Sequence, residues 1–505
     1  MAELHPLSLA IFVIITVVTI AISIYASRRV RTAGHYYVAG GGVKYLVNGV
    51  AIAGDYLSAA SFLGVAGMIA FSGYDGFVYA IGFLAGWVVA LFLVAEPLRA
   101  IGKYTLADAL TSKFKSKKIR LVAAISTLVV SIFYLIPQMV GSGSIVGPLI
   151  GLDYELGVVI IGGLVVFIVA TAGMVSTTWV QFIKGALLMI AVIGLTIGVL
   201  VVSGMGPLEL ISHVTQSDAL TLPSGNVVTG DVFMSPGLKY LDPLDFVSLC
   251  MALILGTAAL PHILIRYFTV PKPSDARKST VVSMVVIGTF YMLILFLGLG
   301  AIYFFQTGAP TINPADANLS APLLARHIGG EAFYAIISSI AFATILGTVA
   351  GLIMASAGAI AHDIYSEVLG RNPDEKKKLY ISKITAISVG IIAIILGILS
   401  KGQNVAFLVG LAFAIAASAN LPALLCVLFW KKTSEKGIVY GMLSGLIAAV
   451  LLIVLSPTMM GGDAVFPLNN PGIVSIPLGF AVTIGVSLLE NRATAKHVVA
   501  EEQAG

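Results

Sequence analysis

Long apolar runs dominate this chain of 505 residues and limit the folds that it can adopt. A bilayer core about 30 Å thick is crossed by an α-helix of about 20 predominantly apolar residues. Thirteen stretches meet that requirement: 7–27, 44–73, 76–99, 119–148, 154–175, 179–203, 243–267, 279–305, 330–361, 379–400, 403–430, 437–456 and 471–489. The sequence therefore predicts an all-α polytopic membrane protein with about 13 transmembrane helices.

The composition excludes most other classes of protein. Charged residues make up 10% of the chain and hydrophobic residues 58%, whereas roughly a quarter of the residues in soluble domains are charged. So few charges cannot cover a soluble surface or form a nucleic-acid interface. The two cysteines, Cys250 and Cys426, lie in apolar runs, which argues against a disulfide scaffold or a metal site.

Basic residues predict the orientation, because Lys and Arg concentrate in the cytoplasmic loops of membrane proteins. With thirteen spans and the N-terminus outside, nearly all of the 29 Lys and Arg residues fall on the cytoplasmic side. This assignment counts Lys184 and Arg266 with the cytoplasmic loops and leaves only Lys239, Arg326 and Lys401 outside. We therefore expect an N-out/C-in protein of the cell membrane, in a bacterium its inner membrane.

Polar residues interrupt two of the predicted helices at membrane depth: GDYLSAAS at 54–61 and GTAALPH at 256–262. The two helices lie five spans apart, so they enter the membrane from opposite sides, as in transporters built from inverted repeats. The predicted organisation is a peripheral first helix and loop (1–43), a first repeat of helices 2–6 (44–203), an extracellular loop (204–242), a second repeat of helices 7–11 (243–430), peripheral helices 12 and 13 (431–489) and a cytoplasmic tail (490–505).

Each interruption also has a structural explanation, because Gly is common in membrane helices and one Pro often only kinks them. The matched placement of the two interruptions favours a functional role. Asp55 favours it further, since an intramembrane carboxylate is costly and by default functional. The alternative for Asp55 is that its carboxylate caps the second half of the broken helix.

A third candidate element is the segment ATILGTVAG at 343–351. Thr344 and Thr348 are four residues apart and share one helix face, while Gly347 and Gly351 allow close backbone approach. Carbonyl oxygens of the first interruption and hydroxyls of this segment would together suit Na⁺, a hard cation. The alternative is a small-residue packing face whose Thr hydroxyls bond to their own helix.

Other polar and aromatic residues inside the predicted helices are candidates for contacting a solute. Four of them also have a structural alternative. His262 could bond to carbonyls freed at the break and Gln138 could form a structural hydrogen bond, while Tyr79 could serve packing and Asn420 capping. The predicted substrate-binding set is Ser58, Ser61, Phe62, Tyr79, Gln138, Thr257, His262 and Asn420.

Charged residues at the cytoplasmic rim predict an inner gate that opens by separating ion pairs. The gate set is Glu96, Arg99, Arg266 and Asp363. The alternative is a set of rim charges that contribute little, as many exposed ion pairs do.

Five segments resemble the sodium:solute symporter family, and within it the cation/acetate symporter branch. They are GDYLSAASFLG (54–64), SGYDGFVYAIGFLAGW (72–87), AEPLRAIGKYTLADAL (95–110), LPHILIRYFTV (260–270) and AFATILGTVAGLIMASAGAIAHDIY (341–365). The resemblance extends over about residues 7–490. It implies an amino acid–polyamine–cation type core with an inverted five-helix repeat and two discontinuous helices.

The resemblance also implies a sodium site between the first interruption and the ninth predicted span, 330–361. Its ligands would be the carbonyls of Gly54, Leu57 and Thr344 and the side-chain positions Gly347 and Thr348, with Asp55 beside them. Sodium-coupled members usually carry hydroxyls at both side-chain positions, and Gly347 departs from that pattern. Na⁺ and H⁺ therefore both stay open as the coupling ion.

Taken together, the sequence predicts a secondary active symporter for a small monocarboxylate, with acetate favoured, and no cofactor. Apolar residues at the first interruption, such as Ala59 and Leu63, suit a substrate with few hydroxyls. The same fold carrying proline, pantothenate, a sugar or urea is the alternative, and a sensor or an intramembrane enzyme is a more distant one. No nucleophile–base pair or phosphate loop indicates an enzyme. The expected partners are the substrate and the lipid bilayer, with no nucleic acid.

Overall fold

The computed structural model describes residues 6–27, 39–102, 104–171, 174–309, 316–371 and 374–504. The predicted loop after the first helix lies largely outside these residues. The first half of the chain forms α1 (Pro6–Ser27), η1 (Ala39–Gly41), α3 (Tyr45–Tyr56), η2 (Ala60–Gly64), α4 (Val65–Val89), η3 (Ala90–Val94), α5 (Ala95–Ile101), α6 (Leu106–Thr111), α7 (Lys117–Ile150), α8 (Tyr154–Thr171) and α9 (Met174–Ser203).

The loop 204–242 contains α10 (Pro207–Thr215), α11 (Gly230–Phe233) and a short antiparallel pair, β1 (Leu220–Thr221) with β2 (Val227–Val228). The second half forms α12 (Pro243–Thr257), α13 (Pro261–Tyr267), α14 (Pro273–Gln306), η4 (Ala317–Leu319), α15 (Ser320–Ala357), η5 (Gly358–Val368), α16 (Glu375–Leu399) and α17 (Val405–Phe429). The elements α18 (Glu435–Val454), α19 (Pro457–Met460), η6 (Gly461–Asp463) and α20 (Gly472–Ala504) follow.

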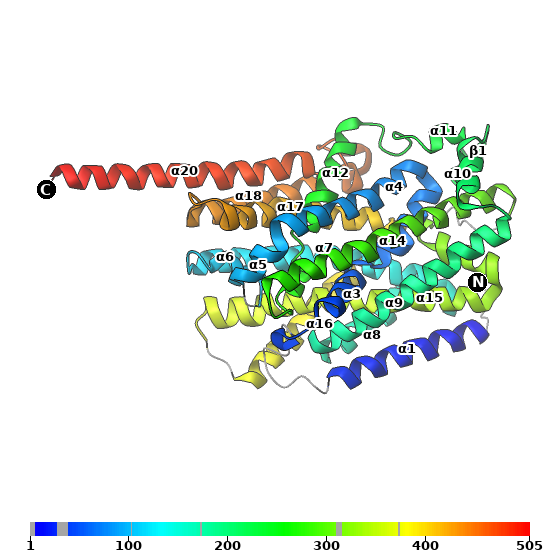
Figure 1. Cartoon of the computed structure of the whole chain (residues 1–505), viewed down its shortest axis with the longest axis horizontal. Helices are drawn as coiled ribbons and strands as arrows, with labels where there is room; N and C mark the ends of the chain where they lie inside the picture. Colours follow the sequence, from blue (N-terminus) through cyan, green and yellow to red (C-terminus); the bar gives the residue numbers. More distant parts are fainter. Residues whose placement is uncertain are drawn as a thin grey trace.

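The long helices run along one common direction (Figure 1). The short helices α5 and α6 lie toward the end where the C-terminus is found, and α10, α11 and β1 lie toward the opposite end with the N-terminus. Such a bundle, with its loops at two ends, is the arrangement that a polytopic membrane protein requires.

Within the described residues, ten helices are long and apolar enough to cross a membrane, and Pro6–Thr19 and Tyr154–Val166 are shorter apolar helices. The predicted all-α polytopic class is confirmed, while the exact number of thirteen spans stays a prediction. In the described part of the chain, ten candidate spans are found rather than thirteen partly because the stretch Ala60–Ile101 counts as one continuous helix, where two predicted spans, 44–73 and 76–99, meet. Its backbone is non-helical at Ser72 and Gly73, and Gly73 adopts a positive φ of 52°.

Both predicted interruptions are present. The helix α3 ends at Tyr56, Leu57 is non-helical (φ −72°, ψ 85°), and the π-helical η2 begins at Ala60. In the second repeat α12 ends at Thr257 and α13 begins at Pro261, whose missing N–H is tolerated in a first helical turn. Interrupted helices expose backbone groups that a continuous helix would pair internally.

Helix packing confirms the inverted repeat. The helix α3 packs against α9 and α14, and its counterpart α12 packs against α17 and α4. Likewise, α15 contacts α9 where α7 contacts α17. The contacts of the two halves correspond when α3, α4, α7 and α9 are matched in that order with α12, α14, α15 and α17. The two halves therefore share one packing scheme.

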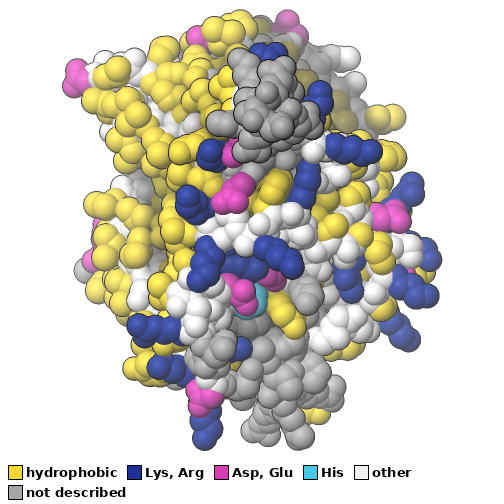
Figure 2. Space-filling model, turned by 90° about the vertical axis from the view of Figure 1, so that its left-hand side faces the viewer, with side chains coloured by type: hydrophobic (Ala, Val, Ile, Leu, Met, Phe, Trp, Pro, Cys, Tyr) yellow, Lys and Arg dark blue, Asp and Glu magenta, His cyan; other side chains and the backbone are white. Residues whose placement is uncertain are grey.

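Basic side chains gather on the end of the molecule that carries α5 and α6, as Figure 2 shows. Exposed members of the connections around α6, α7, α14 and α18 are Lys113, Lys115, Lys117, Lys118, Lys272, Arg277, Lys278, Lys431 and Lys432. This is the distribution expected of a cytoplasmic side. Lys184 and Arg266 differ from the expected placement at the rim, because both are buried inside the bundle.

Two glycines, Gly54 and Gly185, lie in the contact between α3 and α9. A Cβ atom at Gly54 would lie 2.1 Å from the backbone oxygen of Gln181, and one at Gly185 would lie 3.1 Å from the Cα of Gly54. The two backbones therefore leave no room for a side chain at Gly54.

We expect Gly54→Ala to force these helices apart and to destabilise the protein by about 1–3 kcal/mol. The melting temperature of the detergent-purified protein measures this. Gly194→Ala, also in α9, is the matched control, because a Cβ there meets no atom within 4 Å. Equal melting temperatures for the two variants would contradict the described α3–α9 packing.

Candidate functional site

A buried ion pair occupies the end of the first half-helix. Asp55 is fully buried in the last turn of α3, and its Oδ2 accepts a hydrogen bond from Arg266 Nε at 2.9 Å. Its Oδ1 accepts from Gln181 Nε2 at 2.9 Å. Among the described residues no backbone N–H donates to this carboxylate, so Asp55 joins α3 to α9 and α13 rather than capping a helix.

Arg266 therefore lies away from the predicted gate. Its side chain is fully buried, and Nη1 donates to Thr178 Oγ1 at 2.9 Å. Its backbone oxygen accepts from Asn48 Nδ2 at 3.2 Å. Removing one partner of such a pair leaves an uncompensated buried charge, at a cost of about 3–5 kcal/mol.

Lys184, like Arg266, lies inside the bundle rather than at the cytoplasmic rim where the basic-residue pattern predicts it. It lies inside α9 with only 3% of its surface exposed, and Nζ donates to Thr348 Oγ1 at 3.1 Å. The Thr348 hydroxyl in turn donates to the backbone oxygen of Asp55 at 3.2 Å. The lysine thus reaches the point where the first break, α9 and α15 meet. One available signal was its position inside the apolar run 179–203 rather than beyond its end.

The stem of Lys184 also borders an apolar cavity of about 300 Å³ between α1, α9 and α15. Ile14, Val18, Val180 and Ile340 line the same cavity. A long aliphatic stem can cover apolar surface while its polar end reaches elsewhere. Here the polar end reaches inward to Thr348.

Two predicted sodium ligands of α15, Thr344 and Gly347, have different surroundings. Thr344 donates its hydroxyl to the Ala341 oxygen of its own helix at 2.6 Å, which is the structural alternative for that residue. A Cβ at Gly347 would lie 2.6 Å from Gln181 Oε1 and 2.8 Å from Lys184 Cδ. Side chains of α9 therefore fill the space that a hydroxyl-bearing residue at 347 would need.

Two residues whose backbone carbonyls were predicted to bind sodium, Gly54 and Leu57, lie on either side of Asp55 in the sequence. Gly54 and Leu57 are both buried, and the Leu57 N–H donates to the Ala53 oxygen at 2.8 Å. Gly351 faces the Asp55 carboxylate so closely that a Cβ there would lie 2.7 Å from Oδ1. The structure thus brings α3 and α15, the two elements of the predicted site, into contact, and α9 adds Gln181 and Lys184 beside them.

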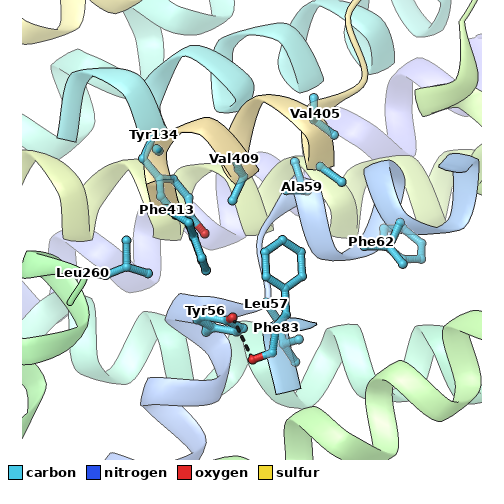
Figure 3. Close-up of a cluster of buried hydrophobic side chains, with 14 of the residues drawn as sticks. Tyr56, Leu57, Ala59, Phe62, Phe83, Tyr134, Leu260, Val405, Val409 and Phe413 are labelled. Carbon is cyan, nitrogen blue, oxygen red and sulfur yellow. Dashed lines mark hydrogen bonds between the residues drawn. The ribbon is translucent and has the colours of Figure 1, made fainter. Parts of the chain in front are cut away.

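Aromatic side chains pack between the two breaks (Figure 3). The ring centroid of Phe413 lies 5.1 Å from that of Phe83, 5.8 Å from that of Tyr134 and 6.1 Å from that of Tyr56. Tyr56 Oη donates to the Phe83 backbone oxygen at 3.1 Å. Figure 3 places Leu57, Ala59 and Phe62 from the first interrupted helix and Leu260 from the second around these rings.

Three predicted substrate residues form hydrogen bonds within the protein. Ser58 Oγ accepts from the N–H of Ala60 at 3.2 Å, at the start of η2. The Ser61 hydroxyl lies 2.9 Å from Tyr291 Oη, and the Thr257 hydroxyl lies 2.9 Å from Tyr56 Oη. The last of these contacts joins the first break to the second.

Asn420 and Tyr79 also have partners. Asn420 donates to the Ala259 oxygen at 3.0 Å and accepts from Ser126 Oγ at 2.6 Å, so it holds the carbonyl freed at the second break. The hydroxyl of Tyr79 is hydrogen-bonded to that of Tyr240 in the outer loop.

Gln138 and His262 differ from the other candidates, because none of their side-chain nitrogen or oxygen atoms has a hydrogen-bond partner among the described residues. Both are at most 2% exposed. The His262 ring packs edge-on against Tyr134, with centroids 5.0 Å apart. Gln138 follows Tyr134 by one turn of α7, and one turn further a Cβ at Gly141 would lie 3.0 Å from the Ala59 Cβ. This face of α7 therefore connects the two breaks.

The residues predicted as one inner gate contact separate partners. Glu96 lies 4.0 Å from Arg277 at an exposed position, and Arg99 Nε donates to the Val270 oxygen at 2.9 Å. Asp363 instead belongs to a network around Arg120, which the sequence analysis did not single out.

Arg120 Nη1 lies 2.7 Å from Asp108 Oδ1 and 2.9 Å from Asp363 Oδ1. Thr105 Oγ1 donates to Asp363 at 3.0 Å, and His362 Nε2 lies 3.3 Å from Asp108. Burial acts to raise the pKa of Asp108, but hydrogen bonds and charges of His362 and Arg120 outweigh it and lower that pKa to about 2. The network ties α6 to α7 and η5.

The ion pair generates a first prediction. Asp55→Asn should leave Arg266 buried without a counter-charge and destabilise the purified protein by about 3–5 kcal/mol. Because the double variant Asp55→Asn/Arg266→Gln removes both charges, it should recover part of that loss. Melting temperatures of the four proteins in the cycle measure the coupling, and strictly additive effects would contradict it.

The inner network generates a second prediction. Arg120→Gln should release α6, so that a cysteine introduced as Ala107→Cys, at a buried position, reacts faster with a maleimide in the detergent-purified protein. Lys118→Gln removes an exposed charge from the same turn and should leave the rate unchanged. Equal labelling rates in both backgrounds would show that Arg120 does not hold α6 in place.

Comparisons with known proteins find relatives that span nearly the whole chain. The sodium:solute symporter family matches residues 36–445. The "Uncharacterized symporter YwcA" of Bacillus subtilis is 45% identical over 503 residues, covering 98% of this chain and 96% of that protein. The "Monocarboxylic acid transporter" of Corynebacterium glutamicum is 43% identical over 493 residues, covering 94% and 90%.

Two solved structures share the fold at low sequence identity. A Na⁺-coupled sialic acid symporter in a substrate-bound outward-open state has a TM-score of 0.74 at 15% identity, covering 96% of this chain and 98% of that one. Mhp1, a nucleobase-cation-symport-1 family transporter in a closed conformation, has a TM-score of 0.56 at 13% identity, covering 92% and 96%.

Proposed function

Because the chain belongs to the sodium:solute symporter family, we propose that it is a secondary active symporter that takes up a small monocarboxylate, with acetate favoured. Uptake would be coupled to inward movement of Na⁺ or H⁺. The family and the fold are those of transporters rather than enzymes. The chain is a multi-pass membrane protein, and its bacterial relatives favour the plasma membrane.

The observation that carries this proposal is the pair of buried, unpartnered side chains between the two breaks. Buried polar groups without a partner are costly, so a ligand that satisfies them gains free energy. The Gln138 amide offers two N–H donors and His262 offers a ring N–H. Both suit the oxygens of a carboxylate, which only accepts hydrogen bonds when ionised.

The surroundings of this pair favour a short, apolar substrate body. Tyr134 packs against His262, and Phe413 packs against Tyr134. Rings in these positions suit a methyl or short alkyl group and offer little to the hydroxyls of a sugar. The printed name of the 43% identical relative, a monocarboxylic acid transporter, supports the same class of substrate.

Transport assays in proteoliposomes test the proposal. Labelled acetate should accumulate when an inward Na⁺ or H⁺ gradient is imposed, and unlabelled propionate, pyruvate, lactate or glyoxylate should compete. Accumulation that survives collapse of both gradients would contradict symport. Competition by proline, pantothenate, a sugar or urea in place of the monocarboxylates would favour the alternative substrates.

The role of Gln138 is tested by Gln138→Ala. A hydrogen bond to a charged group contributes about 1.5–3 kcal/mol, so we expect at least about a tenfold rise in the KM for acetate uptake. Gln216→Ala, at an exposed position in the outer loop, is the control and should transport normally. A Gln138→Ala protein with an unchanged KM would remove this residue from the substrate site.

A further inference from the structure

Where α3, α9 and α15 meet, a side-chain nitrogen contacts one of the predicted sodium ligands. Lys184 Nζ is 3.1 Å from Thr348 Oγ1, the one hydroxyl of the predicted set that is turned away from its own helix. The Thr348 proton goes to the Asp55 backbone oxygen. Lys184 thus engages Thr348, a hydroxyl ligand of the predicted sodium site, and Thr348 in turn engages the carbonyl of Asp55.

The packing at Gly347, beside the lysine stem, also argues against an additional ion. Gly347 supplies no oxygen from its side chain, and the region beyond its Cα is filled by Gln181 and the stem of Lys184. Glycine at 347 and a lysine at 184 therefore fit each other, since a side chain at 347 would compete with the lysine stem for one volume.

The charges point the same way. The carboxylate at this point, Asp55, is already paired with Arg266 at 2.9 Å, and both are fully buried. Among the described residues, no further carboxylate forms a hydrogen bond or ion pair with Asp55, Arg266 or Lys184. A sodium ion bound here would therefore add a positive charge beside an arginine and a lysine. In a low-dielectric interior, like charges at such separations repel by several kcal/mol.

From these contacts we infer that Lys184 takes the place of a coupling sodium ion, so that this site works without Na⁺. Lys184 would then be the residue that determines which ion this symporter uses, and the proton gradient would be left to drive uptake. The inference rests on the proposed transport function and adds the choice of coupling ion to it. Of the two tests below, acetate uptake depends on the proposed function, whereas Na⁺ binding to the purified protein needs no substrate and does not depend on it.

The wild-type protein gives the first test. Its melting temperature should show no saturable rise when choline is replaced by Na⁺ at constant ionic strength, because a ligand stabilises the state that it binds. Acetate uptake should change by less than about twofold on the same exchange. A saturable Na⁺ stabilisation that Thr348→Val abolishes would overturn the inference.

The variant Lys184→Ala/Gly347→Ser gives the second test, because it removes the amine and adds a hydroxyl. We expect this protein to gain a saturable Na⁺ stabilisation and Na⁺ activation of uptake by at least about fivefold, within the usual range of coupling between sites. Lys184→Ala/Gly347→Ala is the matched control, with similar volume and no hydroxyl, and should respond less. A folded serine variant without any response to Na⁺ would contradict the inference.

If acetate is not the substrate, the uptake measurements fail in every variant while the melting data still decide the question of the ion. If instead the melting data show sodium bound at Thr348 in the wild type, the inference about Lys184 fails and the proposed transport function is unaffected.

Discussion

The buried ion pair between Asp55 and Arg266 is the interaction on which the centre of the bundle depends. Both side chains are fully buried, and each charge is tolerated there because the opposite charge is 2.9 Å away. Asp55 is the last acidic residue before the first break and Arg266 follows the second break closely. The pair therefore fastens the two discontinuous helices to each other, and Gln181 and Lys184 of α9 complete the same polar cluster.

The polar cluster and the proposed substrate site are adjacent in the chain. Asp55 faces the cluster, while its neighbour Tyr56 bonds to Phe83 and Thr257 among the aromatic rings. A rearrangement of the first break would move both side chains together, because one non-helical segment carries them. A change of contacts at Lys184 that moved the first break would therefore also alter the surroundings of Gln138 and His262. Coupling between two sites requires such a shared structural element with two arrangements.

Much of this architecture could be predicted from the sequence, because it is encoded locally. Apolar runs set the helices, Asp55 and Pro261 marked the two breaks, and the small residues of 343–351 marked the helix that packs against the first break. Lys184 could not be placed in this way. The positive-inside rule assigns a lysine near the start of a run to the rim, whereas its partner Thr348 lies 164 residues away. The partners of two predicted gate residues could not be identified from the sequence for the same reason, since Arg266 pairs with a carboxylate 211 residues away and Asp363 pairs with Arg120.

The central claim is that a small monocarboxylate binds between the two breaks of a protein whose cation site is already filled by Lys184. Equilibrium binding of labelled acetate to the purified protein, measured by scintillation proximity in Na⁺-free buffer, tests it most directly. The account predicts saturable binding that pyruvate and propionate displace and that proline does not. Binding that appears only after Na⁺ is added, or that proline displaces and pyruvate does not, would contradict it.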